Sequence, residues 1–485
     1  MNGFNLVAVL LVVVGVGTTS GDVQKRTRTI VEKTITGNYE MNLVLTASEV
    51  SQHAKVFFSG NQELSKRAYL AISADGFKVV RETDDDMVIW KEHNDIGRPP
   101  WKVKILKKGN FFRFWVNDMT GWIRGPLGEW ENVYEPMDNC LEVETTEGIV
   151  IQSCTVTMLP WLQEITEPVI SRGPKGSFYE KQIIPGAIIE YDDQYYMYFM
   201  AGMTGNEEGS SRRTIGVAVS KDLNGWDVHP EPLISFLDSP YDNLYVSGAV
   251  VTHEGRVAVM FSVQKFPEWK GFMLATANDP MGPFVLCADN PVYKHFAHAH
   301  EFDLVRVDHP EYRYILFYAG FTPQPQRGPA GDRGYLLYSN NLINWKPEKR
   351  NPVFGPETLD NWDAVHVRPR SLNRVGDTWY LWYEGCNSWK PSGVSHHGWW
   401  DTVGLARSKD LFNWEYYPRN PALPGLGINA DQFDNNWVGW PRMYIKNKVG
   451  YVFYTGNAQV GLRTIPIDDL TNWTTEQGQT LDPLK

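Results

Sequence analysis

The chain has 485 residues, a formal net charge of -11 at pH 7 and a pI near 5.5. Nucleic acids and anionic membrane surfaces are bound through clustered Lys and Arg side chains, and the sequence contains no basic run, so neither partner is expected. Aromatic residues make up 13% of the chain, which favours β-strands and surfaces that stack on sugar rings.

Residues 1–20 predict a secretory signal peptide. Their apolar core runs from Phe4 to Val16 and is followed by the small residues Gly17, Thr18 and Ser20. This run is shorter than the roughly 20 residues that a membrane-spanning helix needs, so cleavage is favoured over anchoring. We therefore expect a secreted protein.

The four cysteines are compatible with secretion. Cys140 and Cys154 flank two strand-like segments around a Thr-Glu-Gly turn, and a hairpin there would bring the two thiols together as a disulfide. Cys287 and Cys386 are expected to be buried thiols. Asn472 begins an Asn-Trp-Thr sequon and is a candidate glycosylation site.

Residues 22–165 predict an antiparallel β-sandwich, because apolar and polar side chains alternate between Gly, Asn and Asp turns. Residues 101–118 form two alternating runs around a Lys-Gly-Asn turn and resemble a hairpin of the concanavalin-like domains that accompany carbohydrate enzymes. Four aromatic side chains either bind glycan or hold the sandwich together: Trp101, Phe111, Trp115 and Trp122.

Residues 166–485 begin with a Pro- and Gly-containing lead-in and then contain five copies of one unit. Each copy ends in an aromatic residue after a polar turn: Trp226, Phe284, Trp345, Trp414 and Trp473. The steps of about 60 residues suit one four-stranded sheet with its loops. One such sheet cannot cover its own edges and apolar face, so the repetition predicts a five-bladed β-propeller.

The innermost strand of each blade lines the channel of a propeller, and its alternate side chains point at the axis. Aligning the five innermost strands predicts a ring of Gln182, Tyr245, His300, His366 and Trp437. Further candidates for substrate binding are Arg368, Trp440 and Arg442. Such side chains hydrogen-bond sugar hydroxyls and stack on sugar rings.

Glycoside hydrolysis needs two carboxyl groups that flank the bond to be cleaved. The candidates near the channel are Glu301, Glu180, Asp363 and Asp303. Asp363 shares its repeat position with Asp242 and Asp434, which also fits a structural turn residue. Glu301 and Asp303 have no counterpart in the other copies. Glu384 either faces a loop pocket or pairs with an arginine.

Two histidines, His298 and His300, lie on one face of a predicted strand, and His366 could join them. Three such side chains could hold a metal ion, although ordinary hydrogen bonding is the favoured explanation of them. A hydrolase of the kind described above requires no cofactor.

The closing strands from Ser220 to Trp226 and from Ser408 to Trp414, together with the five repeats, resemble the five-bladed β-propeller superfamily of glycoside hydrolases. Families 43 and 32 belong to it. The resemblance implies an all-β fold, a five-bladed β-propeller preceded by a β-sandwich, and glycosidase activity in the central pocket. It also implies that His300 or His366 could lie near a central calcium or other divalent ion.

The sequence departs from the family at two positions. Members usually have an Asp before the proline of the first blade and a Glu before that of the fourth, where this chain has Ile184 and Arg368. We expect a secreted glycoside hydrolase acting on an oligosaccharide or polysaccharide. The alternatives are a non-catalytic glycan-binding protein and a His-ligated metal-dependent enzyme. Convergence of Arg368, Arg370 and Arg442 would favour an anionic sugar or phosphate.

Overall fold

The fold is described from a computed structural model. It covers residues 26–481, with the exception of 36–38, 48–51, 61–65, 74, 84–86, 95–98, 109–110, 118, 125–138, 147, 159–166, 203–211, 236–239, 266–267, 297–298, 324–329, 357–361, 387–401, 424–432, 435–437 and 474–479. The predicted signal peptide lies outside the described residues. Strands dominate the described part, whose one helix is α1 (Ile467–Thr471), so the predicted all-β class is confirmed. No helix in that part is long and apolar enough to cross a membrane.

The chain divides into two compact units. One contains Met1–Gln163 together with Glu476–Lys485, and the other contains Glu164–Thr475. From the sequence, the last ten residues were expected to belong to the propeller. The structure instead pairs β31 (Thr480–Leu481) with β11 (Ile149–Met158) of the first unit.

The first unit is a sandwich of two six-stranded sheets. One sheet has the order β1 (Arg26–Ile35), β10 (Asn139–Thr146), β3 (His53–Gly60), β4 (Lys66–Ser73), β5 (Gly76–Thr83) and β6 (Met87–Asn94). The other has the order β31, β11, β2 (Tyr39–Ala47), β7 (Trp101–Lys108), β8 (Phe111–Val116) and β9 (Met119–Arg124). Alternate side chains of both sheets form one apolar core, as expected for a sandwich.

The aromatic candidates of the sandwich differ in position. Trp101 is fully buried in the core, so it supports the sandwich. Trp115 is half-buried, with the ammonium group of Lys104 4.7 Å from its ring centroid. The side chains of Phe111 and Trp122 lie outside the described residues.

The predicted hairpin between Cys140 and Cys154 is wrong. Cys140 is in β10 and Cys154 is in β11, and these strands belong to different sheets because each pairs with other partners. Cys154 is buried in the sandwich core. The side chain of Cys140 lies outside the described residues, and the disulfide stays a prediction.

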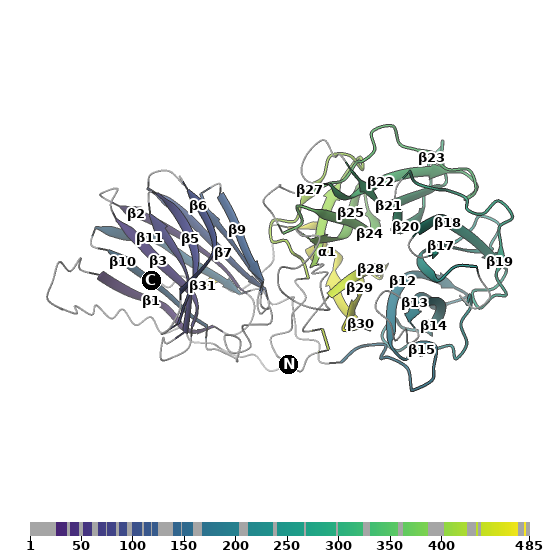
Figure 1. Cartoon of the computed structure of the whole chain (residues 1–485), viewed down its shortest axis with the longest axis horizontal. Coiled ribbons are helices and arrows are strands. Elements are labelled where there is room, and N and C mark those ends of the chain that lie inside the picture. Colours follow the sequence, from purple (N-terminus) through teal and green to yellow (C-terminus); the bar gives the residue numbers. More distant parts are fainter. Residues whose placement is uncertain are drawn as a thin grey trace. The chain divides into compact units, whose positions relative to one another are not determined.

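The second unit is a five-bladed β-propeller (Figure 1). In chain order its strands are β12 (Gln182–Tyr191), β13 (Gln194–Gly202), β14 (Arg213–Ser220) and β15 (Asp227–Val228); β16 (Asn243–Val251), β17 (Val257–Lys265), β18 (Glu268–Ala277) and β19 (Val285–Leu286); β20 (Ala299–Arg306), β21 (Tyr314–Thr322), β22 (Gly331–Ser339) and β23 (Lys346–Pro347); β24 (His366–Val375), β25 (Thr378–Cys386), β26 (Thr402–Ser408) and β27 (Glu415–Tyr416); and β28 (Val438–Lys446), β29 (Val449–Gly456) and β30 (Gln459–Pro466).

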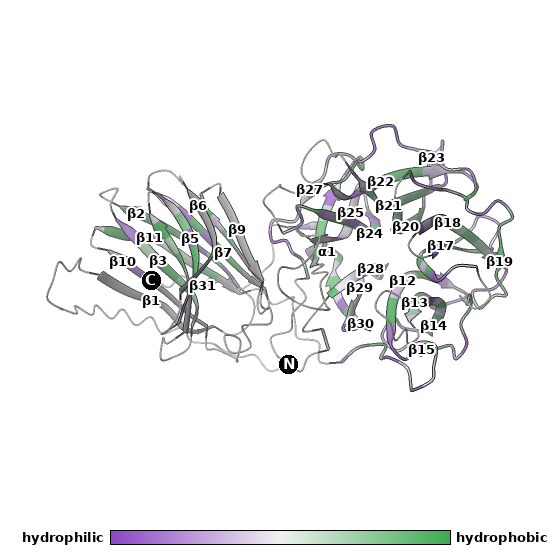
Figure 2. Ribbon diagram, in the orientation of Figure 1, coloured by the Kyte–Doolittle hydropathy of each residue, from purple (hydrophilic) through white to green (hydrophobic). Residues whose placement is uncertain are grey.

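Within each blade the strands pair antiparallel in sequence order. The innermost strands β12, β16, β20, β24 and β28 each contact the next one, and β28 contacts β12, which closes the ring. A single parallel residue pair, Arg213 with Asn243, also links β14 to β16. Figure 2 shows hydrophobic residues in the strands of the blades and hydrophilic residues along many outer loops. The closed ring brings side chains distant in sequence to a common centre.

The closing turn that revealed the repeat has the same geometry in three blades. The hydroxyls of Ser220, Ser339 and Ser408 accept the N–H of the leucine three residues later, at 2.9, 3.0 and 3.0 Å. Those leucines have φ values of 68°, 65° and 69°, and their carbonyls accept the indole N–H of the following tryptophan. The serine hydroxyl and the tryptophan indole therefore stabilise the leucine in the left-handed backbone conformation, which residues other than glycine rarely adopt.

Candidate active site

Each innermost strand contains one irregularity in its pairing with the second strand of its blade. The irregularities lie between Pro185 and Ala187, Val246 and Gly248, Ala299 and Phe302, Pro369 and Ser371, and Gly439 and Arg442. A β-bulge turns a side chain away from strict alternation. Glu301, Arg370 and Trp440 all lie at these irregularities, and the ring brings them together.

Arg370 is the centre of a buried charged cluster. Its side chain is fully buried, and its Nη1 lies 3.3 Å from Oε1 of Glu301. Its Nη2 forms an ion pair with Oε2 of Glu384, which is also fully buried. The guanidinium carbon lies 3.7 Å from the ring centroid of Trp440. One cation thus holds two carboxylates and stacks on an indole, in the low-dielectric interior where such contacts are strong.

Glu384 occupies a position where the other blades have small residues. The corresponding residues of the second strands are Ala201, Ser262, Ala319 and Thr455, all of them buried. The propeller fold therefore does not need a carboxylate there. Burying one is costly unless it is paired, so its presence with Arg370 points to a local function of the cluster.

Trp440 is fixed in an unusual backbone conformation. Its φ is 54°, in the left-handed region that bulky residues rarely adopt, and its side chain is buried. Its backbone N–H donates to Oε1 of Glu384. Both oxygens of Glu384 are therefore engaged, one by Arg370 and one by Trp440. This marks Glu384 as a residue that positions its neighbours, and strained backbone of this kind is concentrated at functional sites.

Asp303 and Arg442 form a second pair in the centre of the propeller. Oδ1 of Asp303 lies 3.9 Å from Nη1 of Arg442, which also donates to the carbonyl of Phe302 at 3.0 Å. Asp303 accepts the backbone N–H groups of Leu372 at 2.7 Å and Leu304 at 3.0 Å. Burial raises the pKa of Asp303, although Arg442 and the two N–H groups act against this.

Tyr245, in the second blade, lies near the cluster of Arg370, Glu301 and Glu384. Its ring is buried, and the guanidinium carbon of Arg213 lies 4.6 Å from its centroid. Burial raises the pKa of Tyr245; the charge of Arg213 opposes that shift and the carboxylate of Glu301 adds to it. Tyr245 is thus within electrostatic range of Glu301. Gln182, from the same predicted ring, is half-buried at the start of β12.

Asp363 has the contacts of a structural residue. Its Oδ2 accepts the hydroxyl of Tyr383 at 3.0 Å, and Oδ2 of Asp434 accepts the hydroxyl of Tyr454 at 2.8 Å in the next blade. The same aspartate–tyrosine pair therefore occurs twice at one repeat position. This geometry explains the repeated Asp without a catalytic role.

His366 and Arg368 contact Asp332 at the start of β22. The Nε of Arg368 donates to Oδ2 of Asp332 at 2.7 Å, and Nδ1 of His366 lies 3.0 Å from the same oxygen. The backbone N–H of Asp332 also lies 3.2 Å from Nδ1 of His366, so the tautomer decides which contact is a hydrogen bond. Both side chains thus join the third blade to the fourth.

Glu180 belongs to a turn before the first blade. Its Oε2 accepts the N–H of Gly176 at 2.8 Å, and its Oε1 lies 3.0 Å from Nζ of Lys181. The Gly176 N–H is the largest cause that lowers the pKa of Glu180, followed by Lys181. These contacts hold the carboxylate ionised in a local turn, so we do not place it with Glu301.

Several predicted residues lie outside the described part of the chain. They are His298, Trp437 and the side chain of His300. The described residues contain no group of three or more His, Cys, Asp or Glu side chains that could hold a metal ion. A metal at His298 and His300 therefore stays a prediction. Asn472 is exposed where α1 ends, and Thr474 of its sequon is outside the described residues.

From the sequence, Arg370 was expected only as a possible member of an arginine cluster and Glu384 only as a pocket residue or a partner of an arginine, so neither was assigned a role in the site. Arg370 is the bulged residue of β24, and a bulge cannot be located from alternation alone. Glu384 had a detectable signal, since it is the one charged residue at a repeat position otherwise filled by Ala, Ser or Thr. Asp332 contacts His366 and Arg368 from a different blade, so no pattern within one copy of the repeat predicts this contact.

No family model matches the sequence, and no curated protein matches it either. Solved structures do show similarity to the chain. A glycosyl hydrolase from Bacteroides ovatus is 16% identical with a TM-score of 0.48, and the match covers 67% of this chain and 95% of that one. A thermostable family-43 glycoside hydrolase is 13% identical with a TM-score of 0.45, covering 58% and 88%. A β-1,2-mannobiose phosphorylase from Listeria innocua, in complex with β-1,2-mannobiose, is 11% identical with a TM-score of 0.48, covering 63% and 97%.

Proposed function

We propose that this protein is a secreted carbohydrate-active enzyme that cleaves glycosidic bonds at the centre of its propeller. The observation that carries the proposal is the pair Glu301 and Asp303 on β20. Both carboxyl groups lie in the interior, and each faces a different arginine, Arg370 or Arg442. Glu301 lies at the bulge of β20 and Asp303 lies two residues further along the same strand, so both carboxyl groups come from one short segment at the centre of the ring, as a two-carboxyl mechanism requires.

The two carboxyl groups have different environments, and this suggests different roles. Asp303 has a pKa raised by burial, so it can donate a proton to the leaving oxygen of the sugar. Glu301 is ion-paired with Arg370, which favours its carboxylate as the group that activates water or stabilises positive charge on the sugar. Two carboxyls with contrasting environments are the usual basis for dividing acid and base roles.

The neighbouring residues support binding of a sugar. Trp440 contributes an indole that stacks on Arg370, and Tyr245 lies within electrostatic range of Glu301, so aromatic side chains of the kind that pack against sugars surround the carboxyl group. Arg370 and Glu384 fix the position of Glu301 and of the backbone at Trp440. The proposal thus assigns contact with the reacting sugar to Glu301 and Asp303, and a positioning role to Arg370 and Glu384.

A second candidate is a glycan-binding protein without catalysis. Two positions that hold carboxylates in the resembling superfamily are occupied here by residues with structural contacts. Ile184 is buried in an apolar cluster, and Arg368 is ion-paired with Asp332. These two observations favour a propeller that binds a glycan and leaves it intact.

The experiment is a hydrolysis screen with arabinosides, xylosides, galactosides and fructosides, run with the wild-type protein and with Glu301→Gln. The first candidate expects at least one substrate to be cleaved and a loss of at least 100-fold in kcat for Glu301→Gln. Binding of an oligosaccharide by calorimetry without any cleavage would support the second candidate instead. Cleavage that Glu301→Gln leaves unchanged would contradict the assignment of Glu301.

A further inference from the structure

A cluster of polar and aromatic side chains lies where the first blade meets the second. Arg213, at the start of β14, pairs with Asn243, at the start of β16, and Asn243 pairs with Gln264 near the end of β17. Paired residues of neighbouring strands point to the same face, and Tyr245 shares that face because it follows Asn243 by two residues. The half-buried indole of Trp269 lies 4.9 Å from the ring of Tyr245 between their centroids. We call these five residues the junction cluster.

The junction cluster lies at the same end of the channel as Glu301. The blades repeat about one axis, so the first residues of their innermost strands meet at one end of the propeller. Tyr245 is the third residue of β16 and Glu301 is the third residue of β20, and these two strands contact each other. The carboxylate of Glu301 also adds to the raised pKa of Tyr245. A ligand of the cluster would therefore lie within electrostatic range of Glu301.

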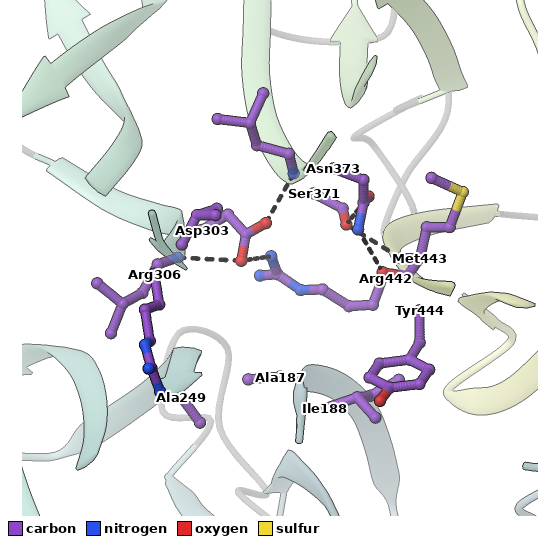
Figure 3. A pocket seen from close by; sticks show the side chains of 13 residues that line it. Ala187, Ile188, Ala249, Asp303, Arg306, Ser371, Asn373, Arg442, Met443 and Tyr444 are labelled. Atoms are coloured by element: carbon purple, nitrogen blue, oxygen red, sulfur yellow. Dashed lines mark hydrogen bonds and ion pairs between the residues drawn. The ribbon is translucent and has the colours of Figure 1, made fainter. Parts of the chain in front are cut away.

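Arg213 differs from other arginines near the centre of the ring. Three of them form ion pairs with buried carboxylates: Arg368, Arg370 and Arg442. Figure 3 shows Arg442 extended toward Asp303, beside a cavity that later residues of the innermost strands line. Arg213 has no ion pair with a carboxylate in the described part of the chain, and its guanidinium carbon lies 4.6 Å from the ring centroid of Tyr245. Its charge is thus not neutralised by a neighbouring acid.

The Nη end of Arg213 is the part that a ligand can reach. The residue is half-buried, and its Nε is enclosed by protein, whereas neither Nη atom is among the enclosed polar atoms. The two Nη atoms carry four of the five guanidinium donors, and they match the two oxygens of a planar carboxylate. Gln264 adds another donor, because its Oε1 accepts the amide of Asn243 at 3.1 Å while its Nε2 donates to no residue in the described ranges.

The charges around the cluster leave room for one anionic group. Glu301 is the carboxylate that acts on Tyr245, and its ion pair with Arg370 reduces its repulsion of an anion. The chain contains 57 acidic residues against 46 Lys and Arg, so a half-buried arginine without an acidic partner is unexpected in it. An acidic surface does not collect anions generally, and binding at Arg213 would therefore be specific.

We propose that Arg213 selects a sugar that carries a carboxylate, a uronic acid, next to the bond on which Glu301 and Asp303 act. The Nη atoms of Arg213 bind the carboxylate, Gln264 donates to a hydroxyl, and the indole of Trp269 packs against the ring. This inference rests on the proposed function, because it takes the ligand of the junction cluster to be part of the substrate. Arg213 and Gln264 determine specificity and take no part in bond cleavage.

The test is calorimetric titration of the full chain with glucuronate and galacturonate, each compared with its methyl ester at constant ionic strength. The ester has the same ring and hydroxyl groups but no charge. Because hydrogen bonds to a charged group are stronger than neutral ones, we expect at least one uronate to bind at least tenfold more tightly than its ester. The measurement needs no turnover.

Two variants test the assignment to Arg213. Arg213→Gln removes the charge and keeps a hydrogen-bonding side chain, and Gln264→Glu keeps the acceptor for Asn243 while adding a negative charge to the cluster. Each is expected to reduce the preference for the uronate over its ester to less than twofold. A purely structural role would weaken both ligands alike and leave that ratio unchanged. Circular dichroism establishes folding, and Gln264→Glu keeps the test decisive if Arg213→Gln does not fold.

Arg256→Gln is the matched control for the loss of a positive charge. Arg256 is exposed, contacts Thr276 and directly precedes β17, at the opposite end of that strand from Gln264. This variant is expected to keep the native preference for the uronate.

Three results would each overturn the inference: the native protein binds neither uronate, an ester binds as tightly as its uronate, or folded Arg213→Gln keeps the native preference. Cleavage of a neutral glycoside alongside any of them would leave the proposed function standing. Uronate binding that depends on Arg213 without any hydrolysis would instead contradict the proposed glycosidase activity and leave Arg213 as the determinant of a uronate-binding site.

Discussion

Arg370 lies 3.3 Å from the carboxylate of Glu301 and is also ion-paired with Glu384, with all three side chains buried. Two carboxylates on one guanidinium leave the trio with a net negative charge. Such a cluster is expensive to bury and gives little stability compared with apolar residues of the same size. Its existence at the centre of the propeller is therefore better explained by function than by folding.

Replacement of Arg370 by Met is expected to destabilise the protein strongly. Glu301 and Glu384 would remain buried without their cation, and breaking a buried ion pair in this way costs roughly 3–5 kcal/mol. Urea unfolding followed by tryptophan fluorescence measures the change in the free energy of unfolding. The exposed Arg256→Met variant is the matched control and should change it by less than about 0.5 kcal/mol.

The double variant Arg370→Met with Glu384→Thr tests the cluster further. The threonine copies Thr455, its counterpart in the fifth blade, so one unpaired carboxylate is removed along with the cation. We expect the double variant to be more stable than Arg370→Met alone. Additive losses from the two substitutions would mean that Arg370 and Glu384 are not coupled.

Asp363 is predicted to matter for stability alone. Asp363→Ala and Tyr383→Phe each remove one side of a buried hydrogen bond, at a cost of about 1–3 kcal/mol. Asp434→Ala and Tyr454→Phe remove the corresponding bond of the next blade and should cost about as much. Thermal unfolding measures all four variants, and a double-mutant cycle should show coupling within each pair. Independent effects of Asp363 and Tyr383 would reject this explanation.

Asp410 lies in the closing turn of the fourth blade, and we expect its ionisation to make the free energy of unfolding depend on pH. The backbone N–H groups of Asn413 and Phe412 hold the pKa of Asp410 below its usual range. A lowered folded pKa stabilises the protein above the unfolded value of about 3.9, and this contribution is lost as the pH falls through the folded value. Asp410→Ala should therefore cost about 1 kcal/mol at pH 7, after allowance for its exposure, and less below about pH 4.

Asn341 provides the uncharged control for that prediction. Its Oδ1 accepts the N–H groups of Ile343 and Asn344 at 3.1 and 2.9 Å, the same geometry in the third blade. Asn341→Ala should cost a similar amount at every pH. If the loss in Asp410→Ala is equally independent of pH, ionisation of Asp410 does not contribute to the turn.

The sequence predicted the propeller well because the repeat is encoded locally. Ser408, Leu411 and Trp414 close one blade by contacts within seven residues, and the same residue types recur in other copies. The last ten residues were misplaced because pairing of β31 with β11 joins segments more than 300 residues apart. The Cys140–Cys154 hairpin failed for a related reason, since both strands found partners in different sheets.

The candidate site was predicted less completely, because bulges and contacts between blades decide it. Glu301, Asp303 and Arg442 were named as candidates on the innermost strands, and the structure places all three at the centre of the ring, where their roles stay a prediction. Strict alternation also assigned His366 and Arg368 to substrate, but Asp332 of the preceding blade engages both. Glu384 was expected either to face a loop pocket or to pair with an arginine, and the structure shows the arginine pair, with Arg370. Comparison of the five copies at that position would also have singled it out, since the other four have Ala, Ser or Thr.

The central claim is that Glu301 and Asp303 are the carboxyls that act on a sugar, and side-by-side hydrolysis rates test it most directly. Glu301→Gln, Asp303→Asn and Asp363→Asn would be assayed on the substrate found in the screen, with folding of each verified by circular dichroism. The account predicts that the first two lose at least 100-fold in kcat, whereas Asp363→Asn keeps the wild-type rate. A folded Asp363→Asn that loses activity while Glu301→Gln and Asp303→Asn retain it would contradict the account.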